Sequence, residues 1–450
     1  MKTIFNNQIA IKFGFVLFLF VLLQIPLSMV SDLISERSHR QQEVQDDIAR
    51  SSSDKQRIIG PFLSVDYIEM VTNEDKTYAM KRQAFILPDT FDLTAHLESF
   101  EKYRGIYQAR LYKAKTALKG SFDLSALSEL RQFDIQDVNM VVGISDSRGL
   151  IKLDNMTLGG KAIDVIPGTG INQLAQGFRT RLDTNQLNAS TMLPFDLNFL
   201  LQGMGQLQVT PIGKNTTVEL SSEWPHPSFI GDYLPISSDI SDAGFNAQWA
   251  SNNFSTNMTQ LFGNCMSDSS SCYEFERRQM GVDLIDPVDH YLKSHRAINY
   301  SLLVITLVFA SFFLLEMLQA RMMHPIQYGF VGLALALFYL LLISLSEHVG
   351  FNWAYVISAL ASTVLLSVYV GGMLKSKKNG LIFGGSLLGL YGLLFGLLLA
   401  ESYALLMGTL LCFAILSLVM VLTRDVDWYE RSCKSLESND EVIRHEQQQA

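Results

Sequence analysis

The sequence is poor in the residues and motifs that most scaffold and enzyme classes require. Only four of its 450 residues are cysteine, too few for a disulfide-stabilised scaffold. It contains no P-loop and no Gly-x-Ser-x-Gly motif, so neither NTPase nor common hydrolase chemistry is indicated. Its Gly-Thr-Gly at residues 168–170 lacks the helix and glycine spacing of a nucleotide fingerprint, and predicts a turn.

The histidines form no metal-binding pattern. There are eight of them, and no His-Glu-x-x-His motif occurs. His290 and His295 have Asp286 and Asp289 beside them, which we interpret as solvated residues where the chain enters the membrane. The sequence therefore predicts no metal, no cofactor and no catalytic residues.

Short polar connections separate five long apolar stretches in the last third of the chain. Each is about as long as the 20 residues that a helix needs to cross a bilayer, so the chain is predicted to be an integral membrane protein. The stretches run from Ala297 to Leu318, Ile326 to Ser346, Phe351 to Leu374, Gly380 to Ala400 and Tyr403 to Leu422.

An earlier apolar stretch, Ile9 to Val30, is either a signal peptide or a membrane anchor. It is long and no Ala-x-Ala-like cleavage site follows it, which favours an uncleaved anchor. The segment from Ser31 to His295 has 24 Lys and Arg against 34 Asp and Glu, a net charge of about −10. Such an acidic segment does not suit nucleic acid or an anionic lipid surface.

Positive charge in the short connections predicts the orientation. Arg321, the lysines between Lys375 and Lys378, and the tail beyond Arg424 would be cytoplasmic together with the N-terminus, whereas the connections at residues 347–350 and at Glu401 contain no Lys or Arg. Both termini are therefore expected inside, with the large segment periplasmic. The expected domains are an anchor (1–30), a periplasmic β-rich domain (31–296), a five-helix transmembrane domain (297–423) and a cytoplasmic tail (424–450).

Short β-branched or alternating runs fill the large segment. A charged helix is expected from Ser31 to Asp54, ended by Gly60-Pro61, and a short one from Asp123 to Arg131. The fold class is thus an α+β membrane protein with six transmembrane helices, its large β-rich domain inserted between the first and second, and sandwich-like or twisted antiparallel. Strands are expected at 62–70, 77–86, 105–118, 138–145, 151–153, 162–165, 198–211 and 216–221.

Two cysteines lie in the segment expected outside. Cys265 and Cys272 are separated by six residues in a Ser-rich loop, and an oxidising compartment would let them pair. The alternative is two unpaired surface thiols, because spacing alone does not give the bond geometry.

The run Trp224-Pro-His-Pro-Ser-Phe is the candidate binding segment. Its prolines fix an extended path that would present Trp224, His226, Phe229 and Asp232 to a partner. The alternative is a rigid connecting loop whose aromatic residues fill the core.

Acidic residues near the helix ends are the candidates within the membrane domain. Glu316, Glu347, His348 and Glu401 each lie near a predicted helix end, where water or headgroups would solvate them. The last three would share the outer surface, either contacting the outer domain or carrying a proton.

Four glycines in the fifth predicted span share one helix face. They are Gly385, Gly389, Gly392 and Gly396, spaced by four, three and four residues. Close helix packing is the expected role, with a mobile gating seam as the alternative.

Several longer motifs give the chain a family resemblance. They are Trp224-Pro-His-Pro-Ser-Phe with Gly231 and Leu234-Pro235, Phe312-Phe313 with Glu316, His324-Pro325-x-Gln327-Tyr328, the run 338–348 with Gly350-Phe351, Thr423-Arg424 with Asp427-Trp428-Tyr429, Gly60-Pro61, Gly143 to Gly149 and Pro167 to Gly170. From anchor to final helix the sequence resembles the CreD family of bacterial inner-membrane proteins.

The resemblance implies a cytoplasmic-membrane protein of a Gram-negative bacterium, linked to envelope integrity, colicin tolerance and a β-lactam-associated regulon. It brings no catalytic residues, so a non-enzymatic protein is expected, with the bilayer and a periplasmic protein or cell-wall component as partners. A transporter or channel component using the acidic set is the alternative, and an enzyme is the third hypothesis.

Overall fold

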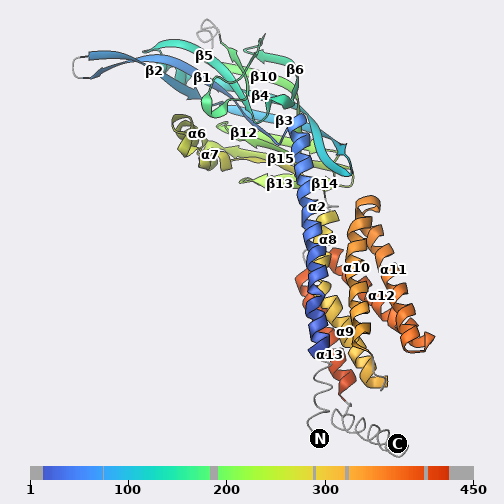
Figure 1. Ribbon diagram of the computed structural model, residues 1–450. Helices are drawn as coiled ribbons and strands as arrows, with labels where there is room; N and C mark the ends of the chain where they lie inside the picture. Colours follow the sequence, from blue (N-terminus) through green and yellow to red (C-terminus); the bar gives the residue numbers. More distant parts are fainter. Residues whose placement is uncertain are drawn as a thin grey trace, which may run out of the picture. The chain divides into compact units, whose positions relative to one another are not determined.

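The chain combines apolar helices with a large β domain. The computed structural model describes residues 14–73, 76–182, 191–286, 290–319, 324–399 and 404–424. Two compact units are present: Met1–His39 with Val288–Ala450, which is helical, and Arg40–Pro287, which holds the strands (Figure 1). The predicted mixture of helices with a large β domain is confirmed.

The β domain consists of two eight-stranded sheets. In sheet A the order is β13 (Pro227–Gly231), β16 (Met280–Leu284), β11 (Gln206–Thr210), β1 (Gln56–Asn73), β5 (Asp134–Ile144), β9 (Gly177–Arg181) and β8 (Ile166–Pro167), with β2 (Lys76–Ile86) paired to β1. In sheet B the order is β14 (Ser237–Ser241), β15 (Gly244–Asn252), β12 (Asn215–Ser222), β3 (Thr90–Arg104), β4 (Tyr107–Asp123), β10 (Met192–Met204), β6 (Leu150–Leu158) and β7 (Lys161–Ala162).

One hydrophobic core joins the inner faces of both sheets. Leu63 and Val65 from sheet A and Leu93, Leu118 and Leu197 from sheet B belong to the same buried cluster. In β10, buried residues alternate with more exposed ones, as expected for a strand with one face in a core. The arrangement is a sandwich, in which alternation places every second side chain inside.

Two features of the sheets differ from the sequence prediction. The β1–β11 and β12–β3 pairs are parallel, so the domain is not purely antiparallel. The long strand β3 was missed, although Phe91, Leu93, Ala95 and Leu97 alternate at period two and are buried. Parallel pairing joins segments that are distant in sequence, which short-range patterns do not reveal.

Gly60-Pro61 does not end the first helix as predicted. Helix α2 (Gln24–Ser51) stops well before it, and the pair lies inside β1. The register between β1 and β5 shifts between Ile59 and Phe62, and Gly60 has φ +118° with the Val141 carbonyl oxygen 2.8 Å from where a Cβ would be. The glycine is needed for the β-bulge and for this close backbone approach.

Short helices cover part of the sandwich. α6 (Met258–Ser267) and α7 (Cys272–Arg277) form a second core with Ile59, Phe62 and Val141 of sheet A. The remaining short elements are α3 (Ser125–Leu130), within the predicted 123–131, α5 (Asn253–Thr256), and the 3-10 turns η1 (Ser147–Gly149), η2 (Asn172–Leu174) and η3 (Ser269–Ser271). The end of α2 packs through Ile48 on Ala109 and Leu111 of β4.

The helices of the other unit follow the predicted apolar stretches. They are α8 (His290–Asn299), α9 (Ser301–Gln319), α10 (Pro325–Val349), α11 (Phe351–Met373), α12 (Lys377–Leu399) and α13 (Ala404–Thr423). In the described part of the chain, four helices are long and apolar enough to cross a membrane: Gly14–Ser51, α10, α11 and α12. α8 and the first part of α9 meet at a 41° bend and would give a fifth span if they count as one, so the total of six crossings stays a prediction.

Candidate functional site

The tryptophan of the candidate binding segment is held by an arginine of β4. The Arg110 guanidinium carbon lies 3.4 Å from the centre of the Trp224 ring, and the indole Nε1 donates to the Ile285 carbonyl oxygen at 2.9 Å. Arg110 is itself bound to the Glu101 carboxylate at 2.6 Å. One face of Trp224 and its only polar atom are therefore occupied within the domain.

The other aromatic residue of this segment is also packed internally. Phe229 lies in β13, and its ring contacts Trp249 at 5.6 Å and Phe245 at 6.2 Å between centroids. The Asp232 carboxylate pairs with Arg277 at 3.7 Å and with Arg278 at 4.0 Å. These contacts match the structural alternative for the segment.

Besides the ion-paired Asp232, His226 is exposed in the predicted set. Its ring stands edge-on to Trp224, 5.6 Å between centroids. The four residues share one segment, but their side chains do not converge on a common point in the described contacts. Whether they bind a partner stays a prediction.

The segment that follows exposes apolar side chains that the sequence analysis did not single out. Leu234, Ile236 and Ile240 are 73%, 66% and 51% exposed. β14 is an edge strand paired with β15, and all five of its residues are exposed. Isolated exposed apolar residues are ordinary, but three on and beside a sheet edge mark a surface that can accept another chain. The sequence signal was the apolar Leu234-Pro-Ile236 run.

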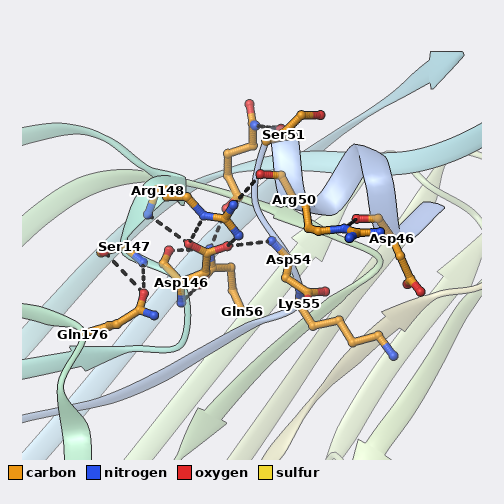
Figure 2. A network of polar contacts seen from close by, with 12 residues as sticks. Asp46, Arg50, Ser51, Asp54, Lys55, Gln56, Asp146, Ser147, Arg148 and Gln176 are labelled. Atoms are coloured by element: carbon orange, nitrogen blue, oxygen red, sulfur yellow. Dashed lines mark hydrogen bonds and ion pairs between the residues drawn. The ribbon is translucent and has the colours of Figure 1, made fainter. Parts of the chain in front are cut away.

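A buried carboxylate fixes the end of α2 to the sandwich (Figure 2). Asp146 is 5% exposed and accepts hydrogen bonds from the Arg148 side chain, at 2.6 Å from Nη2 to Oδ2, and from the Asp54 backbone N–H at 3.0 Å. Arg148 Nη1 donates to the Arg50 carbonyl oxygen in the last turn of α2. One arginine thus joins the carboxylate to the unpaired carbonyls at the helix C-terminus.

A glutamine and a glycine complete this junction. The Gln56 side-chain nitrogen donates to the Asp146 and Gln202 carbonyl oxygens, both at 2.9 Å. A Cβ on Gly149 would overlap that nitrogen and the Gln202 oxygen. The close approach explains the glycine in the Gly143 to Gly149 motif, which the sequence analysis used only for its family resemblance.

The junction perturbs the acidity of its carboxylate. Burial by itself raises the pKa of Asp146, but the hydrogen bonds from Arg148 and from the Asp54 N–H outweigh burial, and the pKa lies below its usual value. The ion pair in turn raises the pKa of Arg148. Asp146 is therefore a charged structural group near neutral pH rather than a proton donor.

A second buried charge links β1 to α7. The Arg57 guanidinium lies 5.4 Å from the Phe275 ring centre, and Nε donates to the Thr210 hydroxyl at 2.9 Å. Burial lowers the pKa of Arg57 to about 10, while the Glu276 carboxylate opposes that change. The arginine stays charged near neutral pH and serves packing.

Among the acidic candidates near the helix ends, Glu347 is bound to two other side chains of the helical unit. Its carboxylate lies 3.7 Å from Nε of Arg37 in α2 and accepts a hydrogen bond from the Tyr291 hydroxyl at 3.1 Å. This cluster joins α2, α8 and the C-terminal end of α10 within the helical unit, whereas the neighbouring His348 is exposed. Glu401 and the side chain of Glu316 lie outside the described residues.

The two cysteines of the β domain are bonded to each other. Cys265 at the end of α6 and Cys272 at the start of α7 form a disulfide bond. In the described part of the chain, no group of three or more His, Cys, Asp or Glu side chains is arranged to hold a metal ion.

The predicted glycine packing face of α12 is wrong. Among the described residues, no atom lies within 4 Å of the position that a Cβ would take on Gly385, Gly389, Gly392 or Gly396. Instead, α12 contacts α11 through Gly380 and Gly384. A Cβ on Gly380 would be 2.7 Å from Gly371 Cα and 2.7 Å from the Ser367 carbonyl oxygen of α11. The helical spacing correctly placed four glycines on one face of α12. The neighbouring helix α11, however, lies against the face that carries Gly380 and Gly384.

Comparisons with known proteins cover nearly the whole chain. Residues 8–429 match the family model described as "Inner membrane protein CreD". The inner membrane protein CreD of Escherichia coli (strain K12) is 35% identical over 428 residues, 94% of each chain. A solved mutant M1 zinc metallopeptidase from Deinococcus radiodurans is 10% identical over 37% of this chain and 39% of its own, at a TM-score of 0.17, a likeness that supports no statement about fold or function.

Proposed function

The chain belongs to the CreD family of inner membrane proteins, and we propose that it supports cell-envelope integrity and stress response without catalysing a reaction. Its β domain would face the periplasm and bind a periplasmic protein or cell-wall component, while the helices anchor the domain or signal. The observation that carries this proposal is the exposed edge strand β14 with its apolar neighbours.

The proposed binding surface consists of β14 with Leu234 and Ile236. An edge strand presents unpaired backbone N–H and C=O groups, which an extended segment of another chain can satisfy while its side chains contact Ile240. The exposed Asp239 and Asp242 favour a segment carrying lysine or arginine. Phe229 packs on Phe245 and Trp249 of β15, the strand that pairs with β14.

The orientation is part of the proposal. Both termini would be cytoplasmic and the chain would cross the membrane several times. The contact of Glu347 with Arg37 supports this, since it brings the end of α10 to the part of α2 that leads into the β domain. The Cys265–Cys272 disulfide supports an oxidising compartment for the domain.

The orientation is tested with single cysteines in the full chain lacking its four native ones. A cysteine at Asp242 is expected to react in intact cells with a membrane-impermeant maleimide, and a cysteine at Ser376 only after the membrane is opened. The reverse pattern would exclude the periplasmic placement.

Site-specific photo-crosslinking tests the binding surface. A photo-reactive phenylalanine analogue at Ile240 of the full chain is expected to give a discrete crosslinked product in living cells. The same analogue at Ile151, which is similarly exposed at 49% on β6, is the control. Equal products at both positions, or none at Ile240, would contradict binding at β14.

The role in the envelope has its own test. In a strain lacking this gene, the wild-type chain is expected to restore resistance to β-lactams and low uptake of a hydrophobic dye, whereas Ile240→Lys should not. Ile151→Lys is the matched control and should restore both. Normal dye uptake and normal β-lactam resistance in the deletion strain would contradict the proposed envelope role.

Transport, the second candidate, receives less support. Glu347, one of the acidic residues that transport would use, is bound to Arg37 and Tyr291.

A further inference from the structure

Hydroxyl groups gather inside the helical unit, between α10, α11 and α12. The Tyr355 hydroxyl donates to the Tyr391 carbonyl oxygen at 2.7 Å, and the Ser362 hydroxyl lies 3.0 Å from the Tyr391 hydroxyl. The Phe338 ring packs on both tyrosines, at 5.7 Å and 4.5 Å between centroids. Three helices thus share one polar spot within an apolar interior.

Three further hydroxyls in this region have no hydrogen-bond partner in the described part of the protein. They belong to Tyr339 of α10 and to Ser358 and Thr363 of α11. Their residues are 2%, 0% and 8% exposed, so bulk solvent does not reach them. The Tyr339 ring packs on the same Phe338 ring, 4.9 Å between centroids.

Three other serines and threonines, in α9, α10 and α12, form local hydrogen bonds instead. The hydroxyls of Thr306, Ser346 and Ser386 each donate to a carbonyl oxygen three or four residues earlier, at 2.7 to 2.8 Å. A serine or threonine hydroxyl in an apolar helix usually forms this hydrogen bond to the preceding turn. The hydroxyls of Ser358 and Thr363 do not form this local hydrogen bond. The Tyr339 hydroxyl is too far from its own backbone to form one.

An unsatisfied hydroxyl in an apolar interior destabilises the fold, so three of them indicate a bound hydrogen-bonding molecule. None of these residues carries a charge, which disfavours a metal cation, because the hard cations prefer carboxylate oxygens. Water is small, donates and accepts, and is the usual partner of buried polar groups.

We propose that ordered water molecules occupy the interior of α10, α11 and α12, bound to the hydroxyls of Tyr339, Ser358 and Thr363. Ser358 lies one helical turn before Ser362, so water there adjoins the Tyr391 hydroxyl. Thr363 faces Gly384 of α12, with its Cγ2 3.7 Å from where a Cβ would be, and extends the site along the same helix pair. The site is a neutral hydrated pocket and is independent of the proposed envelope role.

Hydroxyl-radical footprinting of the full chain in detergent tests the hydration directly. Radicals form from water, so a buried tyrosine beside bound water is modified faster than one that is dry. Tyr339 should be labelled at least three times faster than Tyr328, a tyrosine of α10 that is equally buried and packed against Phe309 and Phe312. Equal labelling of the two would overturn the proposal.

Melting temperatures provide the second measurement. If water binds these hydroxyls, Tyr339→Phe and Ser358→Ala should each lower the melting temperature of the full chain by about 3 °C. Tyr369→Phe, at a half-buried tyrosine of α11, is the control and should leave it unchanged. An unchanged or raised melting temperature for Tyr339→Phe would mean that its hydroxyl binds nothing, which also overturns the proposal.

Discussion

The guanidinium of Arg110 stacks 3.4 Å above the ring of Trp224, and the two residues come from segments that are far apart in the sequence. The tryptophan is therefore a structural anchor between β4 and the loop after β12. This relationship moves the proposed binding surface from Trp224 to the exposed residues around β14.

Arg110→Lys should weaken the β domain although the charge is kept. A lysine lacks the planar group that stacks on the indole, and we expect a loss of about 1 kcal/mol in the free energy of unfolding. Urea unfolding of the full chain in detergent, followed by tryptophan fluorescence, measures it. Arg104→Lys is the matched control, since Arg104 pairs with Asp47 on the surface. An equal loss in both variants would contradict the anchoring role.

The Asp146 junction predicts a pH dependence. The folded pKa of Asp146 lies below that of an unfolded aspartate, about 4, so its contribution is complete above that value and disappears as the pH falls through the folded pKa. Asp146→Asn should cost about 2 kcal/mol at pH 7, and less as the pH falls from about 4 toward 3. Unfolding curves at both pH values check this. A cost that does not shrink in acid would show that charge plays no part.

Two glycines of α12 should respond oppositely to alanine. Gly380→Ala should push α12 away from α11 and lower the melting temperature by at least 5 °C, because its Cβ would overlap backbone atoms. Gly389→Ala has open space and should be neutral or slightly stabilising, since alanine favours the helix. Melting of both variants in detergent is the measurement. Similar losses in both would restore the originally predicted packing face.

A double-mutant cycle tests the Arg37–Glu347 contact. Arg37→Gln and Glu347→Gln should each destabilise the chain, and the double variant should show a coupling of about 1 kcal/mol. The expected value is modest because the Arg37 side chain is 44% exposed, so solvent screens the pair. Additive single effects would mean that the contact contributes nothing.

The disulfide should stabilise the helical cover of sheet A. Replacing Cys265 and Cys272 by serine should cost about 2 kcal/mol, since the bond closes a short loop. Urea unfolding compares this double variant with Cys412→Ser and Cys433→Ser, which leave the pair intact. Free thiols at 265 and 272 in protein isolated from cells would contradict the bond.

The apolar helices, the β-rich nature of the large segment and the family could all be predicted from the sequence. These features depend on length, composition and local period, which each segment carries alone. The same local information predicted about half of the strands, and the alternation of Phe91 and Leu93 would have revealed β3.

Which of the predicted residues contact one another depends on how the elements pack. Asp146 is bound to Asp54 and Gln56 across the sheet, Trp224 to Arg110, and Glu347 to Arg37, each pair from distant segments. The helical period predicted a glycine face on α12 that includes Gly389. The face that contacts α11 is the one with Gly380, which depends on where α11 lies. Contacts of this kind arise when whole elements pack, because the free energy depends on the shape of both surfaces and not on either sequence segment alone.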